Sequence, residues 1–148
     1  CRGGPFAPRR GAHAARRPDF AGSGERRLVV ATPAGERHEF GALMAAAVAS
    51  SAGFSVTYLG PDLPAQDIAT AAARVDAHAV LLSVVRGMDH QEVAREVRAV
   101  REALNGAVPI ILGGSGARDA ARREAMPDAV IVEDFAQLRA ALGTLAVG

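Results

Sequence analysis

The sequence predicts an α/β fold, a doubly wound, five-stranded parallel sheet flanked by helices. Five short runs rich in Val, Ile and Leu recur along the chain, and longer amphipathic segments separate them. Each run is apolar at nearly every position rather than at alternate ones, so each strand must be covered on both faces, as is typical of parallel sheets. The strict alternation of strand and helix supplies the crossover connections that such a sheet needs.

The predicted elements follow one another from residue 28 onward. Local signals indicate several boundaries: Pro64 with Asp67 favours a helix start, and Asn105-Gly106 is typical of a left-handed helix end. The predicted strands are Leu28–Thr32, Ser55–Leu59, Ala79–Val85, Pro109–Leu112 and Ala129–Val132. The predicted helices cover about His38–Ser51, Pro64–Val75, Asp89–Leu104, Ala117–Ala125 and Asp134–Leu145.

Composition removes several classes of function. All 17 basic residues are Arg, and without lysine the standard chemistry of Schiff-base enzymes, Walker-type phosphate loops and phospho-receiver domains is excluded. Cys1 is the only cysteine, which rules out an internal disulfide and a cysteine metal cluster. No apolar stretch reaches the roughly 18 residues of a membrane span, and no signal-peptide core is present. We therefore expect a cytoplasmic protein with no membrane partner.

Charge and composition divide the chain at about residue 26. Residues 1–27 carry seven Arg against two acids and are rich in Gly and Pro, whereas residues 28–148 carry ten Arg against fourteen acids. We expect residues 1–26 to form a disordered basic arm or linker and residues 27–148 to form one domain. Such an arm can touch nucleic acid, although a solvated linker is the simpler interpretation. The first residue is not Met, so a fragment or processed product is expected.

Polar and glycine-bearing segments follow four of the predicted strands. Thr32–Gly41 follows the first strand, Gly60-Pro61-Asp62 the second, and Gly113-Gly114-Ser115-Gly116 the fourth, while Ser83 lies near the end of the third. The carboxyl ends of parallel strands meet at one edge of the sheet, where such folds bind ligands. We therefore expect these segments to form the functional site.

His38 is the candidate metal ligand in the first of these segments. Neutral imidazole is a good ligand for transition metals, and Glu36, two residues earlier, can hydrogen-bond the second ring nitrogen. One histidine cannot hold a free metal ion, so the metal must arrive already chelated, as in a tetrapyrrole-type cofactor. The glycines after the fourth strand would let a bulky group lie against the backbone.

The pattern Glu36-x-His38-x-x-Gly41, together with Ser83 and Gly113-Gly114, resembles the cobalamin-binding domains of methionine synthase, corrinoid mutases and cobalamin-dependent regulators. The resemblance covers about residues 27–145 and implies a flavodoxin-like or Rossmann-like fold that binds adenosylcobalamin or methylcobalamin. It further implies that His38 replaces the dimethylbenzimidazole of the cofactor on cobalt, and that the freed nucleotide tail lies between sheet and helices. The family has Asp where this chain has Glu36, which leaves the strength of the hydrogen bond to His38 open. The implied cofactor-binding residues are Glu36, Arg37, His38, Gly41, Gly60, Ser83, Val85, Gly113, Gly114 and Ser115, with His38 as metal ligand and no catalytic residue.

The run Thr-Pro-x-Gly-x-x-His-x-x-Gly followed by Tyr-Leu-Gly-Pro-Asp is most similar to the C-terminal domains of MerR-type regulators. This similarity predicts a non-enzymatic sensor or regulatory module whose DNA contacts come from an upstream domain; homo-oligomer formation stays open. A cobalamin-carrying domain of a methyltransferase or mutase is the alternative, and a scaffold that has lost the cofactor is a third.

Each motif also has a simpler interpretation. A lone histidine near a helix start is usually solvated, a serine at a strand end is common, and Gly60-Pro61-Asp62 is a good turn. The Ala-rich segment 41–51 is either a good helix former or a helix built to pack closely on a ligand. Asp62, Asp89 and Glu133 are interpreted as caps and surface residues.

Overall fold

The computed structural model describes residues 26–85, 87–126 and 128–146. The basic arm or linker expected at residues 1–26 therefore lies outside the described residues, except for Arg26. The strands are β1 (Arg27–Pro33), β2 (Ser55–Leu63), β3 (Ala79–Ser83), β4 (Ile110–Gly113) and β5 (Ala129–Ile131). The helices are α1 (Phe40–Ser51), α2 (Ala65–Arg74), α3 (His90–Ala103), α4 (Ala117–Arg123) and α5 (Phe135–Leu145).

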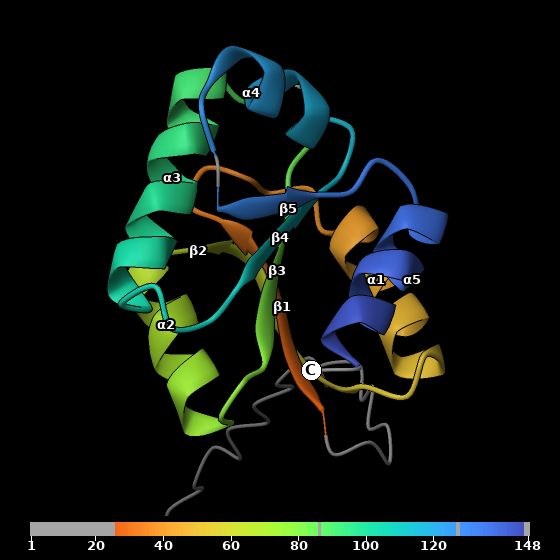
Figure 1. Ribbon diagram of the computed structural model, residues 1–148. Helices are drawn as coiled ribbons and strands as arrows, with labels where there is room; N and C mark the ends of the chain where they lie inside the picture. Colours follow the sequence, from red (N-terminus) through yellow and green to blue (C-terminus); the bar gives the residue numbers. More distant parts are fainter. Residues whose placement is uncertain (1–25, 86, 127, 147–148) are drawn as a thin grey trace, which may run out of the picture.

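The strands form one parallel sheet in the order β2-β1-β3-β4-β5. Helices α1 and α5 lie side by side on one face, and α2, α3 and α4 cover the other (Figure 1). The strand order reverses between β1 and β3, and ligands bind at this point beyond the carboxyl ends of the strands. The predicted fold class and doubly wound architecture are confirmed.

Two apolar layers hold the sheet between its helices. Leu28, Val30 and Leu81 point towards α1 and α5, whereas Val29 and Val80 point towards α2 and α3. All five side chains are essentially inaccessible to solvent. Successive side chains point to opposite faces of the sheet, and helices cover both faces. Both faces of β1 and β3 are therefore apolar.

Several element boundaries differ from those predicted, and each difference has a local cause. Helix α1 begins at Phe40 rather than near His38, because the His38 N–H donates to the Glu36 carboxylate. Strand β3 ends at Ser83 instead of Val85, since the Val85 N–H is likewise bound by Glu36. Strand β2 continues past Leu59 to Leu63 across an irregularity in its pairing with β1.

The predicted helix signals are confirmed where they were strongest. Asp89 accepts hydrogen bonds from the N–H groups of Gln91 and Glu92 at the start of α3. Asn105 and Gly106 both adopt positive φ angles after α3. Within the described ranges, no helix combines the length and the hydropathy that crossing a bilayer requires.

Candidate functional site

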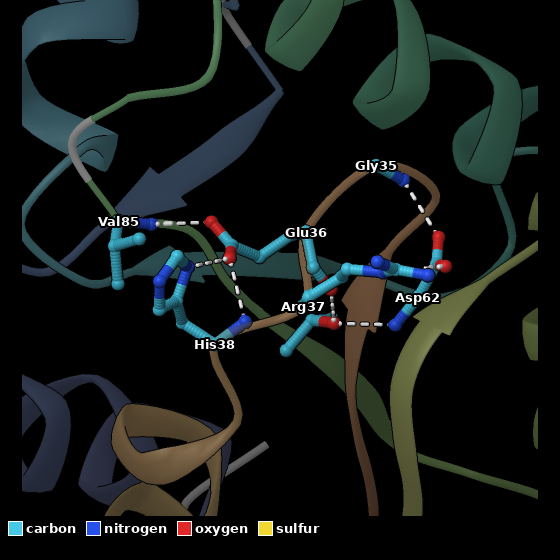
Figure 2. A network of polar contacts seen from close by, with 7 residues as sticks. Gly35, Glu36, Arg37, His38, Asp62 and Val85 are labelled. Atoms are coloured by element: carbon cyan, nitrogen blue, oxygen red, sulfur yellow. Dashed lines mark hydrogen bonds and ion pairs between the residues drawn. The ribbon is translucent and has the colours of Figure 1, made fainter.

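Glu36 is buried at the carboxyl edge of the sheet, where its carboxylate accepts hydrogen bonds from two neighbouring segments (Figure 2). Its Oε2 accepts from the Val85 N–H at 2.9 Å. Its Oε1 accepts from the His38 N–H at 2.8 Å and lies 2.8 Å from His38 Nδ1. A carboxylate only accepts, so Nδ1 carries the proton in this contact. The longer Glu side chain therefore does reach the His38 ring, and the hydrogen bond proposed from the sequence is present.

The His38 side chain is held at one nitrogen and open at the other. Its relative exposure is 75%, while that of the Glu36 side chain is 2%. No described residue hydrogen-bonds His38 Nε2. An imidazole that donates Nδ1–H to a carboxylate keeps its lone pair on Nε2, which is the arrangement of a metal-ligating histidine.

The loop that carries Glu36 and His38 is attached to the end of β2. The Gly35 N–H donates to Asp62 Oδ1 at 2.8 Å, and the Asp62 N–H donates to the Glu36 carbonyl at 2.9 Å. Arg37 is exposed, and its Nε lies 3.8 Å from Asp62 Oδ2. The interpretation of Asp62 as a surface residue was therefore incomplete, because it binds Gly35, Glu36 and Arg37, which lie 25 to 27 positions earlier in the sequence.

A cavity of about 330 Å³ opens at the carboxyl ends of β3 and β4, between α1 and α5. Its lining comes from these four elements, from the loop after β4 and from the loop between β5 and α5. The lining residues are Gly41, Ala45, Leu81, Ser83, Gly113, Gly114, Ser115, Val132, Glu133, Asp134 and Phe135. Since Gly41 lies only three residues after His38, the cavity and the exposed imidazole share one edge of the molecule.

The cavity exists because its walls carry small side chains. A Cβ on Gly41 would lie 3.1 Å from Ser83 Oγ, and one on Gly113 would lie 3.0 Å from Val132 Cγ2. Ser83 is 3% exposed, and none of the described residues hydrogen-bonds its hydroxyl. A nearly buried hydroxyl that faces a cavity is suited to a polar atom of a ligand. The site thus fits a mainly apolar group that carries a hydrogen-bonding atom.

The structure brings together most, but not all, of the residues predicted for the site. Gly41, Ser83, Gly113, Gly114 and Ser115 line the cavity. Glu36, Arg37 and His38 lie in the adjoining loop between β1 and α1, residues 34–39, which we call the ligand loop. Val85 supports this loop by donating to Glu36. Gly60 lies in β2 opposite Ala31 and is not among the lining residues.

Sequence reasoning missed two parts of the site. Val132 and Phe135 line the cavity, but apolar residues near a strand end carry no distinguishing signal. Glu133 was taken for a surface residue; it also lines the cavity and pairs with Arg118 at 3.1 Å. The other missed part is the role of Thr32: the segment that begins with it was predicted to lie at the site, but the hydrogen bonds of this fully buried hydroxyl to Glu36 and Asp62 were not.

Two curated proteins resemble the chain in sequence. The HTH-type transcriptional repressor CarA of Myxococcus xanthus is 35% identical over 95 residues, which cover 63% of this chain and 32% of the repressor. The ethylmalonyl-CoA mutase of Methylorubrum extorquens is 40% identical over 89 residues, which cover 60% of this chain and 13% of the mutase. The chain therefore matches a third or less of the length of each relative.

Solved structures share the fold. A cobalamin-binding protein from Desulfitobacterium hafniense superposes with a TM-score of 0.66 at 24% identity, over 81% of this chain and 58% of that one. The methanol:cobalamin methyltransferase complex MtaBC of Methanosarcina barkeri superposes with a TM-score of 0.68 at 20% identity, over 92% of this chain and 50% of that one. The B12 binding domain profile matches residues 26–142, which are 117 of the 148 residues. The family predicted from the His38 motif is thus confirmed: the chain belongs to the B12-binding domain family.

Proposed function

We propose that this domain binds cobalamin with the dimethylbenzimidazole released from cobalt and with His38 Nε2 as the lower axial ligand. The observation that carries the proposal is the hydrogen bond from His38 Nδ1 to the buried Glu36, which leaves Nε2 open on an exposed ring. When bound, the corrinoid would supply a cobalt that its ring already chelates, so that a single histidine nitrogen would suffice as the protein ligand. The Glu36 carboxylate would fix the tautomer that leaves Nε2 free to bind.

The cavity between α1 and α5 would hold the nucleotide tail that the histidine displaces. Gly41 and Gly113 leave room for a flat base, and the Ser83 hydroxyl offers it a hydrogen bond. Gly114 and Ser115 also line this cavity. In this proposal Arg37 lies within the ligand loop and Val85 supports it, and neither lines the cavity.

We further propose a sensor or regulatory role in the cytoplasm, as the C-terminal part of a transcriptional regulator that contacts DNA through an upstream domain. The similarity to the repressor CarA supports this role. The similarity to a mutase supports the alternative, a cofactor-carrying domain of a corrinoid enzyme. The sequence upstream of Cys1 distinguishes them: a helix-turn-helix domain supports the regulator, and a catalytic domain supports the enzyme. Whether adenosylcobalamin or methylcobalamin is the cofactor is checked by identifying the form that co-purifies.

The axial ligand is tested by electron paramagnetic resonance of the domain loaded with cob(II)alamin, whose unpaired electron couples to the axial nitrogen. In protein labelled with ¹⁵N only at histidine, we expect doublet splitting, because ¹⁵N has spin one half; an axial dimethylbenzimidazole would give the ¹⁴N triplet. His38→Ala should abolish the doublet and weaken binding by more than the roughly 10- to 100-fold expected for a residue that only supports a ligand.

His90→Ala is the control for the loss of a histidine, since His90 lies in helix α3 and not in the loop that carries His38. It should leave doublet and affinity unchanged. A triplet in the labelled wild-type protein, or a doublet that survives His38→Ala, would contradict the assignment of His38.

A further inference from the structure

We propose that Asp62 is a positioning residue for His38, which it holds in its ligating orientation by binding the backbone of Gly35 with its carboxylate and that of Glu36 with its N–H. This inference rests on the proposed ligation of cobalt by His38. Asp62 touches neither the imidazole nor the cavity. Instead, it attaches the ligand loop to the end of the sheet.

Asp62 adopts a backbone conformation that few side chains tolerate. Its φ angle is 55°, in the left-handed region, where a Cβ is strained and where Asn and Asp are the usual exceptions to glycine. Residues are kept in this region only when the surroundings determine their conformation, and such strain gathers at functional sites. Asp62 lies at the end of β2, beside the turn that leads from β1 towards His38.

Two hydrogen bonds join this strained residue directly to the ligand loop, and two more connect it to the loop through the hydroxyl of Thr32. The Asp62 N–H donates both to Thr32 Oγ1 at 2.8 Å and to the Glu36 carbonyl at 2.9 Å. The Thr32 hydroxyl itself donates to the same Glu36 carbonyl at 2.5 Å. The Asp62 carboxylate accepts from the Gly35 N–H at 2.8 Å (Figure 2). The backbone on both sides of the Gly35–Glu36 peptide is therefore bound to the ends of β1 and β2.

The orientation of the His38 ring depends on the position of the Glu36 side chain. With its backbone held on one side by Thr32 and Asp62, Glu36 directs its carboxylate to the Val85 N–H after β3. The same carboxylate orients the His38 ring. The ring itself is exposed and makes no other hydrogen bond to a described residue, so its orientation depends on this chain of contacts. The exposed ion pair from Arg37 to Asp62, at 3.8 Å, adds little.

The test compares Asp62→Gly with Asp62→Asn. Glycine keeps the left-handed backbone without strain but removes the carboxylate, whereas asparagine keeps an oxygen that can accept from Gly35 N–H. Asp76→Gly is the matched control, because Asp76 also has a left-handed φ, 47°, but follows α2, outside the ligand loop.

Two readouts separate positioning from folding. In the cofactor-free protein, we expect Asp62→Gly to speed hydrogen exchange at the His38 and Val85 amides, which both donate to Glu36, while exchange in the middle of β1 stays as in the wild type. In the loaded protein, labelled with ¹⁵N at histidine, we expect a smaller fraction of cobalt with the ¹⁵N doublet and about tenfold weaker binding of cob(II)alamin, the low end for supporting residues. Asp62→Asn and Asp76→Gly should both resemble the wild type.

Wild-type exchange and a wild-type doublet in Asp62→Gly would overturn this inference and leave the ligation by His38 intact. A wild-type protein without the doublet would overturn the proposed ligation and this inference with it. Equal effects of Asp62→Gly and Asp76→Gly would also overturn the inference, since they would show a general cost of the substitution.

Discussion

At Gly114 the backbone passes so close to the end of β3 that a side chain has no room. A Cβ built there would lie 2.1 Å from the Val84 carbonyl oxygen, and the φ angle is 99°. That carbonyl also accepts from the Gly116 N–H at 3.1 Å, so it is not free to turn away. The glycine of the family pattern is thus required by the approach of two strand ends, independently of any ligand.

Gly114→Ala should accordingly destabilise the domain more than a glycine replacement whose only cost is the strain of a positive φ angle. Gly53→Ala supplies the comparison, because Gly53 has a φ angle of 90° with nothing within 4 Å of its Cβ. We expect about 1–2 kcal/mol for Gly53→Ala from left-handed strain and a clearly larger loss for Gly114→Ala. Urea unfolding of both variants measures the difference, and equal losses would show that the contact with Val84 costs nothing.

At the scale of secondary structure, helix α3 is joined to the turn before β5 by an exposed ion pair. Arg101 donates a hydrogen bond to the Asp128 carboxylate. This hydrogen bond, helped by the attraction of the two charges, holds the pKa of Asp128 below its ordinary value of 3.8. The pair connects two segments 27 positions apart, and an exposed pair of this kind contributes modestly to stability.

The sign of its pH dependence follows from the lowered pKa of Asp128. A carboxyl group with a depressed pKa in the folded state stabilises that state above its unfolded pKa. The contribution is lost as the pH falls through the folded value. Asp128→Asn should therefore be less stable than the wild type at pH 7, and the two melting temperatures should converge as the pH falls through the lowered pKa of Asp128. A difference in melting temperature that is constant from pH 7 to pH 2 would contradict this assignment.

At the scale of the whole molecule, the cavity depends on how the helices pack on the sheet, because α1, α5 and the ends of β3 and β4 enclose it together. A ligand that binds only the folded domain stabilises it by mass action, by about 2.7 kcal/mol at 100 times its Kd. Binding of cobalamin should thus raise the melting temperature. The part of this rise that comes from the nucleotide tail can be separated from the part that comes from the corrin.

Gly41→Leu should remove the part of the rise in melting temperature that comes from the tail, because the leucine side chain would fill the cavity beside Ser83. We expect the rise in melting temperature with hydroxocobalamin to shrink strongly, while the rise with cobinamide, which lacks the nucleotide tail, stays as in the wild type. Gly143→Leu is the control, because Gly143 lies in α5 with open space around its Cβ. If Gly41→Leu keeps the full hydroxocobalamin effect, the tail does not occupy this cavity.

Local patterns in the sequence determined the elements of the fold and which of their ends would meet. Uniformly apolar runs such as 28–31 and 79–82 required a sheet covered on both faces, and parallel strands necessarily bring His38, Ser83 and Gly113 to one edge. The contact of Glu36 with the His38 ring could be anticipated because it spans only two residues. Helix caps such as Asp89 were predictable for the same reason.

Only the tertiary structure decided the contacts between segments far apart in the chain. Glu36 reaches Val85 across 49 positions, and Asp62 holds Gly35 across 27. Strand β2 reaches Asp62 across an irregularity in its pairing with β1, which no local pattern encodes. Such contacts depend on the relative placement of strands, whereas hydrophobic periodicity reports only which face of each element is buried. The sequence therefore identified the ligand loop, and the packing of β1, β2 and β3 determined how that loop is held.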